Sequence, residues 1–216
     1  MSAGRAKPER PVAVLVVIFT VDDNQLHVLL VRRSAQPFKD AWSLPGGFMA
    51  PAESPDDAAV RKLAEETGVA DVFLEQLYTF SDLDGRTSLA VAYFALVDSR
   101  QALLARRSEW LPKWFSVAGV PPLAFRNEEV VDYALRRLRA KLDYSNVAYS
   151  LLPEEFRLSD LQVTYEAILG RSLDKRNFRK RVLSLGFIEP TGRTSSAGRH
   201  RPAQLYRFRE RRPVVF

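Results

Sequence analysis

Cysteine is absent from the 216 residues of the chain, and histidine occurs only twice, as His27 and His200. Without cysteine the protein has no disulfide framework, no thiolate zinc site and no cysteine nucleophile, which suits a reducing compartment. The two histidines share no local spacing, so a transition-metal site is not indicated. The sequence also lacks a Ser-His-Asp arrangement, a phosphate-binding P-loop and a dinucleotide-binding GxGxxG pattern. Several common enzyme classes are therefore excluded.

Long hydrophobic runs are also missing. The longest, Val12–Phe19, has eight residues, whereas a helix needs about 20 to cross a bilayer. The polar stretch Thr20–Asp23 follows it, where a secretory signal would have a small-residue cleavage pattern. We therefore expect a cytoplasmic protein without a membrane partner.

A net positive charge is lacking in the first two thirds of the chain and belongs to the last third. Residues 1–145 hold 18 Lys and Arg against 19 Asp and Glu, whereas residues 146–216 hold 14 against 7. Such an asymmetry predicts a separate basic module with an anionic partner, most often nucleic acid. A basic tail that is merely solvated is the alternative.

The first part of the chain has the pattern of a mixed α/β domain, since 46% of all residues are hydrophobic and 27% charged. Ser54 and Pro55 predict the start of a helix that Gly68 ends, and Asn127 is expected to cap a helix running to about Leu142. The remaining expected segments are a flexible N-terminal arm (1–10), a hairpin (12–19 and 26–31), a loop (32–52) and two further strands (72–80 and 88–97).

After Tyr144 the pattern changes to two short helices and a hairpin. Ser159 is expected to cap a helix over 160–169, and Asp174 one that runs to about Leu185. Short strands over 187–189 and 204–208 flank a loop rich in Gly, Ser and Arg. Two helices and a small hairpin describe a winged helix, although a small α+β appendage that only packs or dimerises fits the same topology. We predict a first domain over residues 11–145 and a winged helix over 146–216.

The most specific motif runs from Gly47 through Glu53 to the stretch Arg61–Val69. It resembles the Nudix box, which is a glycine, five residues, Glu, seven residues, Arg-Glu, an aliphatic residue, any residue, Glu-Glu, any residue, Gly and an aliphatic residue. The chain departs at one position, where Lys62 replaces the glutamate of the Arg-Glu pair. The resemblance implies an α/β fold of the Nudix α/β/α sandwich type, with Glu53 and Arg61 as a structural pair.

Lys62 bears directly on metal binding. Positions three and four apart share one face of a helix, so Lys62 is expected beside Glu65 and Glu66. In Nudix hydrolases a carboxylate at this position joins those two glutamates in holding Mg²⁺, a hard cation that prefers oxygen ligands. An ammonium there repels the ion and cannot activate water. We expect no catalytic residues, no required cofactor, and weak or lost Mg²⁺ binding at Glu65 and Glu66.

Residues 175–180 carry the composition of a DNA-recognition helix. Phe178, Val182 and Leu185 form an apolar stripe, which places the charged residues opposite. Arginine can pair with guanine and asparagine with adenine, and basic side chains can hold phosphates. The candidate DNA-binding residues are Lys175, Arg176, Asn177, Arg179 and Lys180 of the helix, and Arg193, Arg199, His200 and Arg201 of the wing.

Both domains together resemble the NrtR family, the Nudix-related transcriptional regulators of NAD metabolism. The resemblance in the second domain rests on Leu151–Phe156, Leu158–Gln162, Tyr165–Gly170, Leu173–Arg179 and Gly198–Ala203. In the first domain, Trp42–Phe48 is similar to ADP-ribose pyrophosphatases. The family implies a homodimeric repressor of NAD biosynthesis or salvage genes that binds a palindromic double-stranded DNA operator and is released by an NAD-derived ligand, typically ADP-ribose.

We expect the ligand to be bound by residues of the Nudix box and the loop before it. These are Arg33, Phe38, Gly46, Gly47, Glu53, Arg61, Glu65 and Glu66. The competing hypothesis is an Mg²⁺-dependent ADP-ribose pyrophosphatase with a basic docking domain, in which Asp82, Asp84 or Glu109 supplies the missing carboxylate.

Overall fold

The computed structural model of the chain describes residues 11–69, 72–83, 89–98, 111–195 and 202–216, so the predicted arm over 1–10 lies outside the described residues. No helix in these ranges is long and apolar enough to cross a membrane. The elements of the first domain are β1 (Val12–Asp22), β2 (Gln25–Arg32), β3 (Trp42–Ser43), β4 (Gly46–Phe48), α1 (Pro55–Thr67), β5 (Glu75–Ser81), β6 (Leu89–Leu96), β7 (Leu111–Ser116), η1 (Val117–Gly119), η2 (Ala124–Arg126) and α2 (Asn127–Lys141). Those that follow are η3 (Val147–Leu151), β8 (Phe156–Arg157), α3 (Leu158–Leu169), α4 (Lys175–Ser184), β9 (Ile188–Thr194) and β10 (Gln204–Phe208).

A mixed sheet forms the centre of the first domain. Its strand order is β3-β2-β1-β6-β5, with β4 paired to β1 and β7 paired to β2. Strands β1 and β6 are parallel, and the other pairs are antiparallel. Because β1 and β6 are apolar on both faces, each face of the sheet needs a covering layer.

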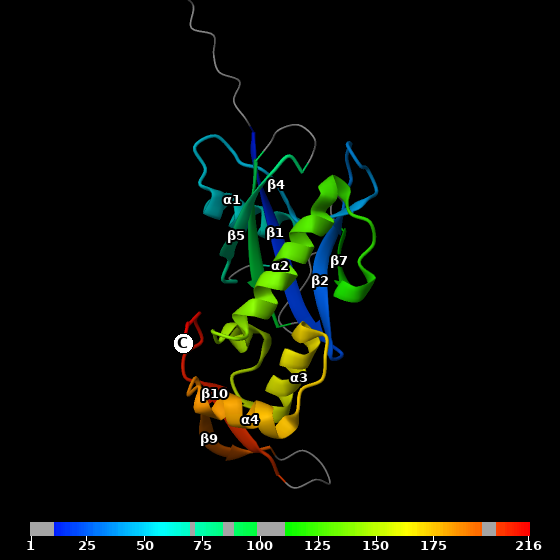
Figure 1. The fold of residues 1–216 in the computed structure, drawn as a ribbon. Helices are drawn as coiled ribbons and strands as arrows, with labels where there is room; N and C mark the ends of the chain where they lie inside the picture. The colour runs from blue at the N-terminus through cyan, green and yellow to red at the C-terminus, as the bar shows by residue number, and fades with distance from the viewer. Residues whose placement is uncertain (1–10, 70–71, 84–88, 99–110, 196–201) are drawn as a thin grey trace, which may run out of the picture.

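The two long helices of this domain supply those layers (Figure 1). Ala59 and Leu63 of α1 join one apolar cluster with Val16 of β1. Ala134 and Leu138 of α2 join a second cluster on the opposite face of the sheet. This arrangement confirms the predicted α/β/α sandwich.

The strands differ in extent from the sequence prediction. The hairpin turns at Asp23 and Asn24, whose positive φ values of 45° and 59° match the turn type that suits a twisted hairpin. Strand β5 begins at Glu75 rather than at residue 72. Strand β7 was missed because Pro112 and Lys113 interrupt its apolar pattern, and the predicted loop over 32–52 contains the short strands β3 and β4.

Two helix starts also differ from prediction. Asn127 is the first residue of α2 and makes no cap; its side-chain oxygen instead accepts from the backbone N–H of Leu44 at 2.9 Å. Helix α3 begins at Leu158, two residues before the expected start, because β8 ends at Arg157 and the helix follows without a loop. The carboxylate of Asp160, three residues after Arg157, accepts from the backbone N–H of Arg157 at 2.9 Å, and Ser159 lies inside the helix rather than at its cap.

The second domain is a winged helix, as predicted. Strands β8, β10 and β9 form its small sheet in that order. Phe178 and Val182 of α4 are buried, and the Phe178 ring lies edge-on to Tyr165 of α3 with centroids 5.3 Å apart. The same apolar cluster continues from α2 into α3, α4 and β10, so the domains pack against each other.

Candidate functional site

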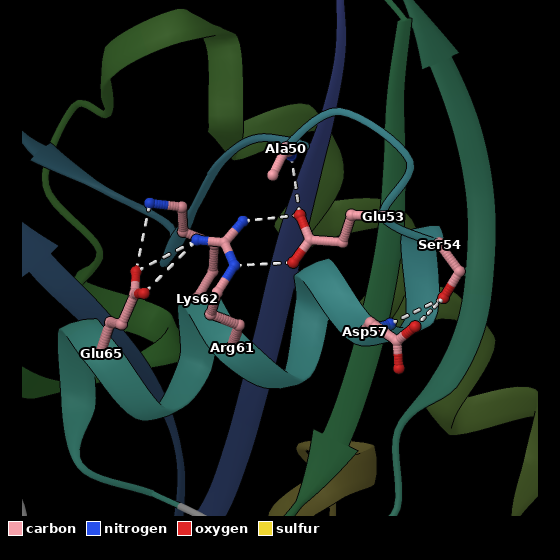
Figure 2. A network of polar contacts seen from close by, with 7 residues as sticks. All are labelled: Ala50, Glu53, Ser54, Asp57, Arg61, Lys62 and Glu65. Carbon is pink, nitrogen blue, oxygen red and sulfur yellow. Dashed lines mark hydrogen bonds and ion pairs between the residues drawn. The ribbon is translucent and has the colours of Figure 1, made fainter.

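The glycine-rich loop, which comprises residues 46–54, is held to α1 by a two-pronged ion pair (Figure 2). Arg61 donates from Nε and Nη2 to the two oxygens of Glu53, each at 2.7 Å. The backbone N–H of Ala50 also donates to Glu53, at 2.8 Å. The bonds from Arg61, followed by that from Ala50, lower the pKa of Glu53 to about 2. Glu53 and Arg61 therefore tie the loop to the helix, which is the pairing that the resemblance to the Nudix box implies.

Glu65 is shared by two cations on the same helix. Its carboxylate lies 3.3 Å from Nη1 of Arg61 and 3.3 Å from Nζ of Lys62, as Figure 2 shows. Lys62 therefore reaches Glu65 across one helical turn, in agreement with the expected i, i+3 spacing.

Glu66 is buried, with 2% of its surface exposed. Its Oε2 accepts from the backbone N–H of Gly46 at 3.0 Å, whereas Oε1 has no hydrogen-bond partner among the described residues. Burial is the main cause that raises the pKa of Glu66 to about 7. A Cβ on Gly46 would lie 2.2 Å from the carbonyl oxygen of Val14, so only glycine fits this approach to β1.

These groups surround a cavity of about 620 Å³ between α1, the glycine-rich loop and the start of α2. Five of the eight predicted ligand-binding residues line it, namely Arg33, Phe38, Gly46, Gly47 and Glu66. The other three, Glu53, Arg61 and Glu65, are not among its described lining residues. Arg61 pairs with both of these glutamates. Lys62, Phe125 and Asn127 also line the cavity, although the sequence did not suggest the last two.

An aromatic and cationic group forms one wall. Phe38 and Phe125 meet edge to face with ring centroids 4.9 Å apart, and the Arg33 guanidinium lies over the Phe125 ring at 4.7 Å. Arg33 also donates from Nε to the carbonyl of Pro37 at 2.9 Å, and burial is the main cause that lowers its pKa. Such a wall can stack on a planar base and place a positive charge beside it.

A divalent cation does not fit the carboxylates that the structure describes. Glu53 is bound by Arg61, Glu65 is shared by Arg61 and Lys62, and one oxygen of Glu66 is occupied by Gly46. Across the described ranges, no group of three acidic or histidine side chains could hold a metal ion. Asp82 is exposed at the end of β5, while Asp84 and Glu109 lie outside the described residues.

The second candidate site is the outer face of α4. Lys175, Arg176, Asn177, Arg179 and Lys180 are all exposed, and Asp174 caps the helix by accepting from the backbone N–H of Asn177 at 2.9 Å. No ion pair joins the four basic residues of this set to another described residue. The face therefore presents uncompensated positive charge to solvent.

The wing is described only in part. Arg193 lies in β9 and pairs with Glu155 at 3.1 Å, with 73% of its side chain exposed. Arg199, His200 and Arg201 lie outside the described residues.

Comparison with known proteins assigns each of the two domains to a protein family. Residues 9–139 match the model of the NUDIX domain, and residues 148–208 match that of the NrtR DNA-binding winged helix domain. The ADPR responsive transcriptional repressor NtrR of Acinetobacter baylyi is 39% identical over 210 residues, which cover 93% of this chain and 83% of that protein.

Two solved structures of Shewanella oneidensis NrtR are also similar. The structure complexed with a 27mer DNA is 38% identical with a TM-score of 0.79, and the match covers 92% of this chain and 93% of that one. The NUDIX domain complexed with ADP ribose is 39% identical with a TM-score of 0.57, covering 63% of this chain and 94% of that one. The chain thus belongs to the NrtR family, in which a Nudix domain is joined to a winged helix domain.

Proposed function

We propose that the protein is a DNA-binding transcriptional repressor of NAD biosynthesis or salvage genes, whose Nudix domain senses ADP-ribose or a related NAD-derived ligand. The observation that carries this proposal is the exposed face of α4, where four basic side chains flank Asn177 without a described acidic partner. Phosphate contacts from such side chains position a protein on DNA, and arginine and asparagine read bases in the major groove. The similarity to the DNA-bound S. oneidensis protein supports the same role.

The cavity of the Nudix domain is the proposed ligand site. Its volume of about 620 Å³ lies within the usual range for small-molecule pockets, about 300 to 1,000 Å³. Phe38 and Phe125 offer aromatic surface to a purine, and Arg33 offers charge. The similar NUDIX domain that was solved with ADP ribose supports this ligand class.

We further propose that the Nudix domain is a degenerate hydrolase that needs no metal cofactor. Lys62 stands where the Nudix box has a glutamate and pairs with Glu65 at 3.3 Å. Mg²⁺-assisted attack of water on a diphosphate needs oxygen ligands for the ion, and an ammonium supplies none. The alternative hydrolase function therefore has no support from the described carboxylates.

Helix α2 provides a physical connection between the two sites. Its first residue, Asn127, lines the cavity, and near its other end Nε of Arg139 donates to the carbonyl of Ile168 in α3 at 2.9 Å. In Figure 1, α2 runs from the part of the first domain that holds α1 and β4 toward the winged helix. A ligand that shifts the start of α2 can therefore change the position of α3 and α4.

As a homodimer, the protein would present two copies of α4 to a palindromic operator. Half-sites about 34 to 36 Å apart, or a multiple of that distance, suit two recognition helices on one side of the duplex. A ligand that favours a different separation of the two helices must weaken DNA binding, with a coupling of about 1 to 3 kcal/mol.

Fluorescence anisotropy with the DNA upstream of the protein's own gene tests the proposal. We expect specific binding that saturating ADP-ribose weakens. Arg176→Ala and Asn177→Ala should each weaken it by about 1 to 3 kcal/mol, the range for a good base contact. Arg137→Ala is the matched control, since it removes an exposed arginine of α2. Equal affinity for unrelated DNA, or operator binding that ADP-ribose leaves unchanged, would contradict the proposal.

A further inference from the structure

We propose that Lys62 supplies the positive charge that holds the diphosphate of the ligand, so that ADP-ribose binds without a divalent cation. The inference rests on the proposed function, because it concerns the same cavity. It assigns Lys62 a binding role of its own, beyond the loss of a metal ligand.

The side chain of Lys62 is placed at the cavity by its neighbours. It lines the cavity next to Gly47, and a Cβ at Gly47 would lie 3.1 Å from Cε of Lys62. The lysine stem therefore passes close to the bare backbone of the glycine-rich loop, and 21% of the side chain is exposed. An ammonium held in this way is accessible to a ligand that enters the cavity.

The contact with Glu65 does not prevent this role. Glu65 lies 3.3 Å from Lys62 and 3.3 Å from Arg61, so two cations share its single negative charge. With 44% of its side chain exposed, Glu65 forms the kind of solvated ion pair that contributes little to stability. The ammonium can therefore turn from Glu65 to a phosphate oxygen at low cost.

The charges of the cavity wall favour an anion. Among the described lining residues, the charged side chains are Arg33, Lys62 and Glu66. Two cations against one carboxylate leave an excess of positive charge even when Glu66 is ionised. They also come from different elements, since Arg33 follows β2 and Lys62 lies in α1. A diphosphate, with charged oxygens on two phosphorus atoms, can contact both.

A metal-dependent site would need the opposite charge pattern. Mg²⁺ usually binds substrate phosphates through one or two carboxylates and several waters. Here the Lys62 ammonium stands beside Glu65, so the ion would have to displace Lys62 from that carboxylate. The same lysine that repels a cation attracts the diphosphate directly.

Isothermal titration calorimetry of the full chain with ADP-ribose tests the inference. For the wild type we expect dissociation constants in EDTA and in Mg²⁺ that agree within about twofold. Lys62→Gln should weaken ADP-ribose binding by about 10- to 100-fold, the range for losing one charged hydrogen bond. Adenosine, which lacks the phosphates, should bind both proteins equally. Lys62→Arg should retain most of the affinity, and Lys62→Glu should make binding depend on Mg²⁺.

Controls separate the inference from the proposed function. Lys113→Gln removes an exposed lysine of β7 and should leave ADP-ribose binding unchanged. A wild type that binds ADP-ribose only with Mg²⁺, or a folded Lys62→Gln variant of unchanged affinity, would overturn the role of Lys62 while leaving the sensor function intact. A wild type that binds ADP-ribose in neither buffer would overturn both. The comparison of EDTA with Mg²⁺ uses the wild type alone, so it does not depend on the folding of a variant.

Discussion

At the scale of single residues, Glu66 is the one carboxyl among the described residues that line the cavity. Burial raises its pKa from 4.5 to about 7, so the folded protein binds its proton more tightly than the unfolded chain does. Its stabilising contribution is therefore fully present below about pH 4.5 and is lost as the pH rises through about 7. A difference of this size corresponds to about 3 kcal/mol.

Glu66→Gln should remove this pH dependence, because glutamine keeps the shape of the side chain but cannot ionise. We expect the stability of the variant, relative to wild type, to increase by up to about 3 kcal/mol between pH 5 and pH 8. Urea unfolding of both proteins at the two pH values measures the difference in the free energy of unfolding. Ionisable groups that the two proteins share contribute equally to both values and cancel in this difference. Glu128→Gln, at an exposed position of α2, controls for the loss of a carboxylate. An equal difference at the two pH values would refute this account of Glu66.

At the scale of elements, a largely buried ion pair ties the end of α2 to the edge of the sheet. Nζ of Lys141 lies 3.0 Å from Glu75 of β5, and 9% of the Lys141 side chain is exposed. The pair lines a small cavity that Val214 of the C-terminal segment also lines. Breaking such a pair leaves one charge without its partner, which is more costly than replacing both residues.

Lys141→Met should destabilise the protein by about 2 to 3 kcal/mol, somewhat less than for a fully buried pair because Glu75 is partly exposed. The double variant Lys141→Met/Glu75→Gln should recover a large part of that loss. Chemical unfolding of the wild type, of Lys141→Met, of Glu75→Gln and of the double variant forms a double-mutant cycle that measures their coupling. If the two substitutions have additive effects on the free energy of unfolding, Lys141 and Glu75 are not energetically coupled.

At the scale of the whole molecule, an apolar core and several polar contacts join the domains. The apolar core runs without a break from the sheet into α3 and α4. Arg139 links α2 to the carbonyl of Ile168. The carboxylate of Asp143 accepts from Nη2 of Arg181 in α4 at 2.9 Å, and the carbonyl of Tyr144 accepts from the N–H of Phe216 at 3.0 Å. The winged helix is therefore positioned by α2 and by the chain that returns after β10.

Arg139→Ala should weaken the coupling between the two sites. We expect ADP-ribose and DNA each to bind with nearly wild-type affinity, while the effect of one ligand on the other falls by about 0.5 to 2 kcal/mol. Anisotropy titrations of DNA with and without saturating ADP-ribose measure this coupling. Arg137→Ala is the matched control, since it is an exposed arginine two positions away on α2. Coupling that is unchanged in Arg139→Ala would show that this link does not transmit the signal.

Local features were predictable because they depend on short-range geometry. The resemblance to the Nudix box implied the Glu53–Arg61 pair, which the structure shows at 2.7 Å. The cap at Ser54 and the stop at Gly68, which depend on such geometry, were confirmed. Helical periodicity likewise placed Phe178 inward and Arg176 outward.

The sequence by itself thus determined the order of the domains, the α/β/α sandwich with its winged helix, and the charge of each part. Only the tertiary structure decided which of these residues meet. Phe125 reaches Arg33 and Phe38, and Asn127 binds the backbone of Leu44, 83 positions earlier. Contacts over such separations are set by how α2 packs on the sheet. A periodic pattern specifies the face of a helix but not what that face meets.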